Sequence, residues 1–185
     1  MTFILSGTPA QTAMQPLPDS PVATNHVHAK VVKPKLVNST EQEHETQVEK
    51  RYTDQDVEAL AKMVYGEALI THSDMEMSAV VWCVVNRFIS GDPYYSKCHS
   101  LYDIVVQKSQ FFGYSTNNPV DEHIEWLVID VLDRWSREMD GETDVGRTLP
   151  QDYLFFHGNG RHNLFTKTYG SANHWDWSYE NPYDN

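Results

Sequence analysis

A single glutamate, Glu67, has the clearest candidate chemistry in this chain. It follows Gly66 at the end of a segment with helically spaced apolar residues, so a rigid element can aim its carboxylate into a cleft. Cleavage of a glycosidic bond needs one protonated carboxylic acid at the leaving oxygen. Partial burial beside aromatic residues such as Tyr65 would raise the pKa of this acid toward a working pH. A glutamate at a helix end is more often a solvated surface group, so this position alone does not decide the chemistry.

A glutamine and three aromatic residues gather in the segment SQFFGYS at residues 109–115. Gln110, Phe111 and Tyr114 suit a loop that stacks on the face of a sugar and hydrogen-bonds its hydroxyl or acetamido groups. The alternative is a loop whose phenylalanines fill the core, and the sequence leaves both interpretations open.

Histidines and aromatic residues are concentrated near the end of the chain. The histidines are His157, His162 and His174. They stand among six aromatic residues: Tyr153, Phe155, Phe156, Tyr169, Trp175 and Trp177. Three histidines raise the question of zinc, but their spacing fits no strong ligand motif and no helix carries two of them four residues apart. Aromatic side chains with polar tips suit a carbohydrate groove instead.

Two capping boxes predict the starts of the first two helices. Thr53 with Asp56 precedes apolar residues at helical spacing, and Ser73 with Glu76 precedes a second, broader apolar stripe. The Gly and Pro at 91–93 end the second helix.

A short helix over 101–107 and a long one over 120–139 complete the helical part, with Gly141 after the long helix. The long helix turns six apolar side chains inward: Ile124, Leu127, Val128, Val131, Leu132 and Trp135. The aromatic run at 153–157 and the segment 164–170 are suited to a hairpin. The expected fold class is therefore α+β, mostly helical, with a small C-terminal hairpin or sheet.

Residues 1–50 differ in composition from the rest of the chain. Five of the nine prolines lie there, aromatic residues are nearly missing, and such a segment cannot bury enough apolar surface to offset its ordering entropy. We predict a disordered tail or tether over 1–50 and one folded domain over 51–185. The start MTFILSG has no basic region and is too short for a secretion signal, so the chain is expected to stay inside until release or to use an unconventional signal.

The net charge of −12 excludes some classes of partner. It disfavours nucleic acid and anionic lipid, both of which bind clustered Lys and Arg. No apolar run is long enough to span a membrane. The two cysteines are too few for a disulfide scaffold, and Cys83 in the run AVVWCVV is expected to be a reduced core thiol.

Five short segments occur in order along the chain: LAKMVYGEA (60–68), VVWCVVNR (80–87), SQFFGYS (109–115), YLFFH (153–157) and YGSANH (169–174). As an ordered set they resemble the SleB-like cell-wall hydrolases, known from spore-cortex lytic enzymes and phage lysins. The resemblance covers about 55–176. The chain departs from the family pattern where Ser171 and Ala172 separate Gly170 from Asn173, and in the loop LITHSDMEM after YGEA.

The resemblance implies a lysozyme-like fold related to lytic transglycosylases, with Glu67 as the catalytic acid. Asn86 matches a structural hydrogen-bonding position of the family. Eight residues are expected to bind substrate or shape the cleft: Tyr65, Gln110, Phe111, Tyr114, His157, Tyr169, Asn173 and His174. The implied partner is the peptidoglycan glycan strand, cut between N-acetylmuramic acid and N-acetylglucosamine, at the cell envelope or after release of a phage lysin.

The mechanism stays open between two routes. A glycoside hydrolase normally uses two carboxylates, and Asp74, Glu76 and Asp152 offer no assured second one; the first two are expected to be helix-start anions. A lytic transglycosylase needs a single acid, no metal and no organic cofactor. The alternatives from other classes are a glycan-binding or structural envelope or virion protein without catalysis, and a zinc amidase that cuts the stem peptide.

Overall fold

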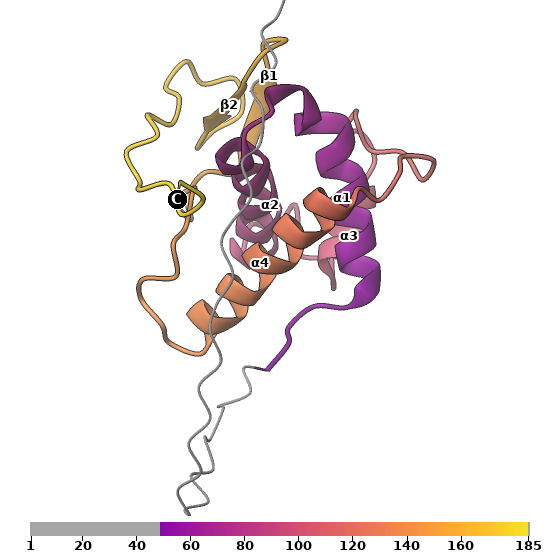
Figure 1. Cartoon of the computed structure of the whole chain (residues 1–185), viewed down its shortest axis with the longest axis vertical. Coiled ribbons are helices and arrows are strands. Elements are labelled where there is room, and N and C mark those ends of the chain that lie inside the picture. Colours follow the sequence, from indigo (N-terminus) through magenta and orange to yellow (C-terminus); the bar gives the residue numbers. More distant parts are fainter. Residues whose placement is uncertain (1–48, 185) are drawn as a thin grey trace, which may run out of the picture. The chain divides into compact units, whose positions relative to one another are not determined.

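The computed structural model describes residues 49–184 (Figure 1), so the predicted tail over 1–50 lies almost entirely outside it. The elements in order are α1 Asp54–Ala68, the 3-10 helix η1 Leu69–Thr71, α2 Asp74–Ile89, α3 Leu101–Val106, α4 Glu122–Met139, β1 Phe155–Gly158 and β2 Asn163–Thr166. The part of the chain that the structure describes is thus mostly helical with one small antiparallel sheet, as the sequence pattern predicted.

The first predicted capping box is confirmed and the second is only half formed. At α1, the Thr53 hydroxyl accepts from the backbone N–H of Asp56 and the Asp56 carboxylate accepts from the N–H of Thr53. At α2, the Ser73 hydroxyl accepts from the N–H of Glu76. The Glu76 carboxylate does not return to Ser73, however, because it is engaged with a distant segment at residues 162–163.

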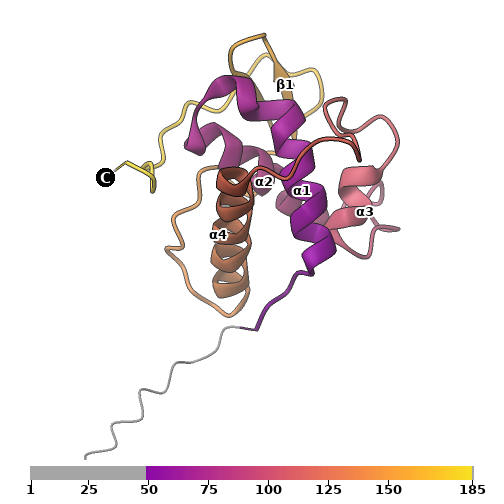
Figure 2. The ribbon, with the colours of Figure 1, turned by 45° about the vertical axis from the view of Figure 1, so that its right-hand side comes forward.

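Helix α2 is the centre of the fold. Every residue from Glu76 to Arg87 is buried, and α1, α3 and α4 pack on this helix (Figure 2). The six side chains predicted to face inward from α4 are all buried. Burial on all sides explains why α2 is apolar around its whole circumference rather than along one stripe.

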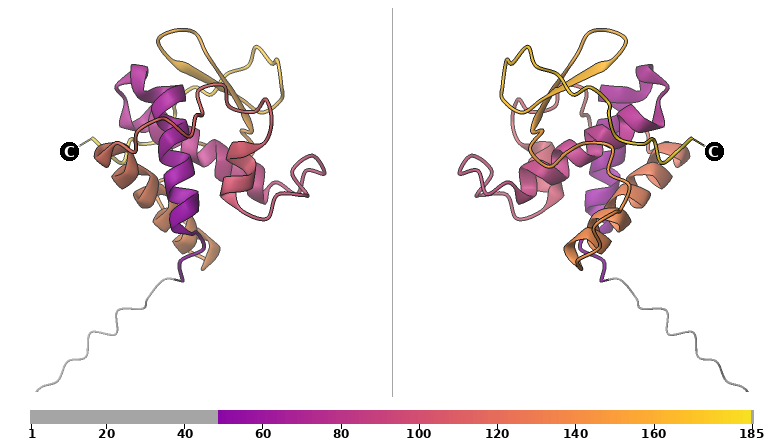
Figure 3. Two further views of the ribbon diagram at one scale, coloured as in Figure 1. Left: turned by 90° about the vertical axis from the view of Figure 1, so that its right-hand side faces the viewer. Right: turned by 90° about the vertical axis from the view of Figure 1, so that its left-hand side faces the viewer.

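The hairpin is shorter than the aromatic runs predicted. β1 pairs with β2 from Phe155 opposite Thr166 to Gly158 opposite Asn163. The second strand ends at Thr166 because the chain turns there: the Thr166 hydroxyl donates to the carbonyl of Thr168, and Gly170 follows with a φ of +72°. Figure 3 shows the hairpin at the end of the bundle where α1 ends, opposite the segment that leads into α1.

Asn86 holds the segment before the hairpin against α2. Its amide nitrogen donates to the carbonyls of Pro150 and Tyr153 at 2.8 and 3.0 Å, and its oxygen accepts from Arg147. These bonds give Asn86 a structural role in this chain.

Two further predictions concern the described helices and the thiols. No helix within residues 49–184 is both long and apolar enough to cross a membrane. Cys83 and Cys98 are free thiols, and burial raises the pKa of the Cys83 thiol, which is therefore an inert part of the core.

Candidate functional site

A cavity of about 730 Å³, here called the Glu67 cleft, opens where α1 ends. Its charged lining residues are Glu67, Arg87 and Asp92. Its aromatic lining residues come from four parts of the chain: Tyr94, Tyr95, Phe112, Phe155, Phe156 and Tyr169. Ser109, Gln110, His157 and Gly158 complete the lining. The cleft therefore combines one acid from a rigid helix end with aromatic surfaces from surrounding loops and the hairpin.

Two glycines let a loop approach Glu67 closely. A Cβ atom on Gly66 would lie 1.9 Å from the carbonyl oxygen of Gly113, and a Cβ on Gly113 would lie 2.4 Å from the carbonyl carbon of Gly66. Only hydrogen fits at both positions. As a result, the N–H of Gly113 reaches the Glu67 carboxylate and donates to its Oε1 at 2.6 Å.

Two asparagines fix the surroundings of Glu67 further. The side chain of Asn118 donates to the carbonyls of Lys62 and Gly113, which ties the loop to α1. The side chain of Asn163 donates to the carbonyl of Glu67, and its backbone N–H donates to Glu76. Glu67 is thus held between a loop on one side and the start of β2 on the other.

The Glu67 carboxylate is half-buried, and its second oxygen accepts no hydrogen bond from residues 49–184. No Lys, Arg or His within residues 49–184 forms an ion pair with it. One oxygen is therefore fixed by a backbone N–H, while Oε2 has no hydrogen-bond partner among the described residues.

Arg87 is a buried cation at the base of the same cleft, with only 4% of its surface exposed. Its Nε donates to the carbonyl of Leu154 at 2.7 Å and its Nη1 to Gln110 Oε1 at 3.3 Å. Its guanidinium carbon lies 4.7 Å from the centre of the Phe111 ring. In the part of the chain that the structure describes, no carboxylate pairs with it. Aromatic faces and neutral oxygens therefore stabilise this charge.

Four of the predicted site residues line the cleft: Glu67, Gln110, His157 and Tyr169. Gln110 is half-buried beside Arg87, whereas Tyr169 is 89% exposed and touches the Phe155 ring edge to face, with centroids 6.0 Å apart. The structure brings these residues together from four separate segments of the chain.

Three predicted residues lie away from the cleft. Phe111 is buried, with its ring 6.0 Å from that of Phe156, so for this residue the core interpretation is right. Tyr65 is half-buried against the core. Tyr114 opens onto a separate depression beside Lys62 and Tyr102. The exposed aromatic of the loop is instead Phe112, which is 92% exposed.

The predicted histidines divide between two places. The rings of His157 and His174 lie with their centroids 5.5 Å apart. His174 therefore contacts a residue that lines the cleft but does not line the cleft itself. Asn173 beside it is exposed, and its N–H donates to the Ser171 hydroxyl. His162 lies elsewhere, with its Nδ1 2.7 Å from Glu76. The three histidines do not form one cluster.

Sequence reasoning missed most of the residues after α2. Asp92, Tyr94 and Tyr95 follow the end of this helix and line the cleft, as does Arg87 in its last turn. Burial raises the pKa of Tyr95, an effect that the nearby Arg87 opposes. The run DPYY at 92–95 was the available signal, since two adjacent tyrosines directly after a helix end place large aromatic rings with polar tips in a turn; Tyr95 is buried and Tyr94 is exposed.

The other candidate acids are engaged outside the cleft. Asp74 lies 2.8 Å from the His123 ring, and Asp152 forms an ion pair with Lys167 at 2.6 Å. Glu76 is buried and bonded to the hairpin. Asp92 is the other acid of the cleft lining, and one of its oxygens already accepts from the N–H of Tyr94 at 2.8 Å.

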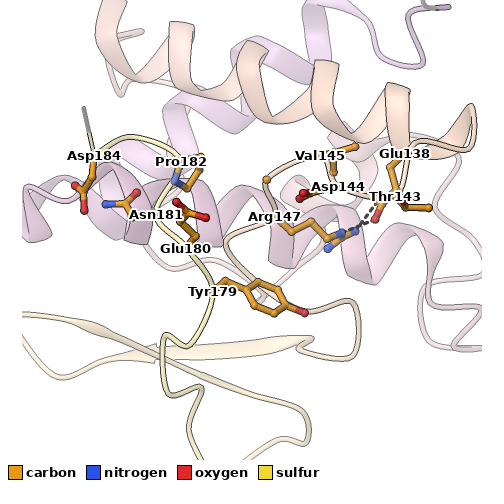
Figure 4. Close-up of a pocket in the computed structure, with 11 residues that line it drawn as sticks. Glu138, Thr143, Asp144, Val145, Arg147, Tyr179, Glu180, Asn181, Pro182 and Asp184 are labelled. Atoms are coloured by element: carbon orange, nitrogen blue, oxygen red, sulfur yellow. Dashed lines mark hydrogen bonds and ion pairs between the residues drawn. The ribbon is translucent and has the colours of Figure 1, made fainter.

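A second cavity of about 510 Å³ lies between the end of α4 and the segment 179–184 (Figure 4). In Figure 4, Arg147 faces Glu138, and the two side chains form paired bonds of 2.7 and 2.9 Å. Arg147 also lies over the Trp82 ring, 4.0 Å from its centre. None of the predicted site residues lines this cavity.

No protein-family model, curated protein or solved structure matches this chain. The Glu67 cleft offers a carboxylic acid with one oxygen fixed by a backbone N–H, exposed aromatic faces, and polar groups oriented by a buried arginine.

Proposed function

We propose that this protein cleaves the glycan strand of peptidoglycan as a lytic transglycosylase, with Glu67 as the general acid and base. The observation that carries the proposal is the position of Glu67. Its Oε1 is fixed by the Gly113 N–H, and its other oxygen has no donor among residues 49–184 and lies in a cleft with exposed aromatic side chains. The proposal includes a lysozyme-like domain of the SleB-like type.

In this reaction Glu67 acts twice. As an acid it gives its proton to the glycosidic oxygen between N-acetylmuramic acid and N-acetylglucosamine, and the bond from the muramoyl C1 to that oxygen breaks. As a carboxylate it then takes the proton of the muramoyl C6 hydroxyl, whose oxygen bonds to C1 and closes a 1,6-anhydro ring. The proton count balances, Glu67 returns to its starting form, and no water, metal or organic cofactor takes part.

The single-acid route agrees with how the neighbouring carboxylates are used. Glu76, Asp74 and Asp152 have partners outside the cleft. Asp92 lines the cleft, but one of its oxygens serves as acceptor for the Tyr94 N–H. The C6 hydroxyl of the substrate supplies the nucleophile, so the protein need not activate a water molecule.

Exposed aromatic residues support a polymeric sugar as the substrate. Phe112 and Tyr169 are about nine-tenths exposed and both line the cleft, on separate loops. Large apolar side chains in such positions leave water when a sugar ring stacks on them. A glycan of several units could contact both while one linkage lies at Glu67. Such a substrate would be met at the cell envelope.

The proposal is tested by a digest of purified peptidoglycan, with the masses of the soluble fragments measured. The expected products carry 1,6-anhydromuramoyl ends, which are lighter by one water than reducing ends. Glu67→Gln should give no products, since its amide keeps the Gly113 bond but has no proton to donate as an acid.

Three other outcomes would revise the proposal. Reducing-end products would show hydrolysis and require a second carboxylate or an activated water. Binding without cleavage would favour a glycan-binding module. Activity that a chelator abolishes and that releases stem peptides would favour a zinc amidase.

A further inference from the structure

Three polar side chains form a hydrogen-bonded chain across the Glu67 cleft. Arg87 Nη1 donates to Gln110 Oε1 at 3.3 Å, and Gln110 Nε2 lies 3.0 Å from the hydroxyl oxygen of Tyr94. The chain begins at a buried cation and ends on a tyrosine that is 57% exposed. It therefore connects the base of the cleft with its open side.

The chemistry of the three groups fixes the direction of every bond. An arginine side chain has donors only, so the Gln110 atom that faces it must be the carbonyl oxygen. The Gln110 atom that faces Tyr94 is then the NH₂ group, which can only donate. The Tyr94 oxygen must accept, and its own O–H points elsewhere. No acceptor for that proton is found among residues 49–184.

Tyr94 is also fixed through its backbone and ring. Its N–H donates to Asp92 Oδ1 at 2.8 Å, and its ring meets that of Tyr95 edge to face with centroids 5.1 Å apart. The side chain thus needs little ordering when a ligand arrives, which favours binding.

We propose that Tyr94 is a substrate-binding residue whose O–H donates to a carbonyl or hydroxyl oxygen of the bound glycan, and that Arg87 and Gln110 are positioning residues that keep it a donor. The class of ligand rests on the proposed function. The acetamido carbonyl of an N-acetylated sugar is the strongest neutral acceptor that such a strand offers.

The test uses variants that change the direction of one bond with little change of shape. Tyr94→Phe removes the donor. Gln110→Glu keeps the bond to Arg87 but replaces the NH₂ group by an acceptor, so the Tyr94 O–H turns to the introduced carboxylate and is lost to the ligand. Tyr179→Phe, an exposed tyrosine outside the cleft, is the matched control.

Affinity for a soluble oligomer of N-acetylglucosamine and turnover of purified peptidoglycan are measured for each full-length variant. Loss of one neutral hydrogen bond should weaken affinity and raise KM about three- to tenfold, with kcat little changed. Tyr94→Phe and Gln110→Glu should give equal losses, and the double variant should lose no more than either alone. The thermal midpoint of Tyr94→Phe should match the control, and that of Gln110→Glu should be no lower, since its carboxylate pairs with the buried Arg87.

Each result decides the inference separately from the proposed function. Unchanged affinity and KM in Tyr94→Phe overturn the role of Tyr94, and a loss in Tyr94→Phe without one in Gln110→Glu overturns the positioning by Gln110. A wild-type chain that binds the oligomer but does not cleave peptidoglycan refutes the proposed function, and the affinities still test the inference. A wild-type chain that binds neither probe overturns both.

Discussion

The cavity of Figure 4 and the Glu67 cleft differ in how their arginines are paired. In the cavity of Figure 4, Glu138 and Arg147 satisfy each other with paired bonds, and Arg147 further binds Asn86 and lies over Trp82. In the Glu67 cleft, an acid and a buried arginine line the same cavity but form no ion pair with each other. Paired charges stabilise a fold, whereas separate charges held by neutral groups remain available to a ligand. The difference therefore lies in the two arginines: Arg147 has a carboxylate partner, whereas Arg87 has none among residues 49–184 and stays a separate charge in the candidate site.

The largest expected effect is on the turnover of peptidoglycan when the glutamate of each cavity, Glu67 or Glu138, is replaced by glutamine. Glu67→Gln should lower turnover of peptidoglycan by at least about 100-fold, since general acid catalysis contributes on that order. Glu138→Gln should leave turnover within about twofold but lower the free energy of unfolding by about 2 kcal/mol, because Arg147 loses a charged partner. Turnover assays and urea unfolding measure the two effects. Equal loss of activity in both variants would remove the distinction.

Adjacent phenylalanines should separate stability from binding. Phe111→Ala removes a buried ring and should cost about 3 kcal/mol of unfolding free energy. Phe112→Ala removes an exposed ring and should leave the thermal midpoint unchanged while weakening affinity for an N-acetylglucosamine oligomer about fivefold. Thermal unfolding and titration on the same preparations test both. The reverse pattern would mean that Phe111 is the ligand contact.

Asp92→Asn asks whether the cleft uses a second acid. The asparagine oxygen keeps the acceptor for the Tyr94 N–H, so we expect turnover within about threefold of wild type and the same anhydro products. The rate and the product masses are measured together. A loss as large as that of Glu67→Gln would instead assign Asp92 to the chemistry and favour hydrolysis.

The smallest expected effect concerns alkaline stability on the side of α4. Burial, and next the Asp130 carboxylate, raise the pKa of Tyr183 above its ordinary value of about 10. A group with a raised folded-state pKa contributes stability that is present below its unfolded pKa and lost as the pH rises toward the folded value. Unfolding free energy should therefore fall above pH ~10, and less steeply in Tyr183→Phe. Urea unfolding from pH 8 to 11 measures the slope; an identical slope in the variant would contradict this assignment.

The elements of the fold could be predicted because their signals are local. The Thr53 cap, the spacing of apolar residues in α4 and the two aromatic runs lie within a few turns of the structure that they predict. The position of Glu67 could be predicted for the same reason, since the spacing of apolar residues in α1 predicts the helix near whose end Glu67 lies.

The details of the cleft depend on contacts between distant residues. Phe111 rather than Phe112 is buried, and its ring packs on Phe156, a residue of β1 much later in the chain. The Glu76 carboxylate does not accept from the Ser73 N–H, as a capping box requires, because it accepts from the N–H of Asn163 instead. The Tyr94 hydroxyl is connected to the other polar groups of the cleft by its hydrogen bond from Gln110, 16 positions later in the chain. Periodicity and short motifs carry no information on such pairings.

The bonds around Glu67 also determine when the site can exist. Its side chain is bonded to a residue 46 positions later and its carbonyl to one 96 positions later. A nascent chain on the ribosome can form α1 early, yet it cannot bring these partners to Glu67 until Asn163 has emerged. We therefore expect the complete cleft to assemble only after the hairpin has emerged, so that chains cut short before the hairpin lack the cleft however helical they are.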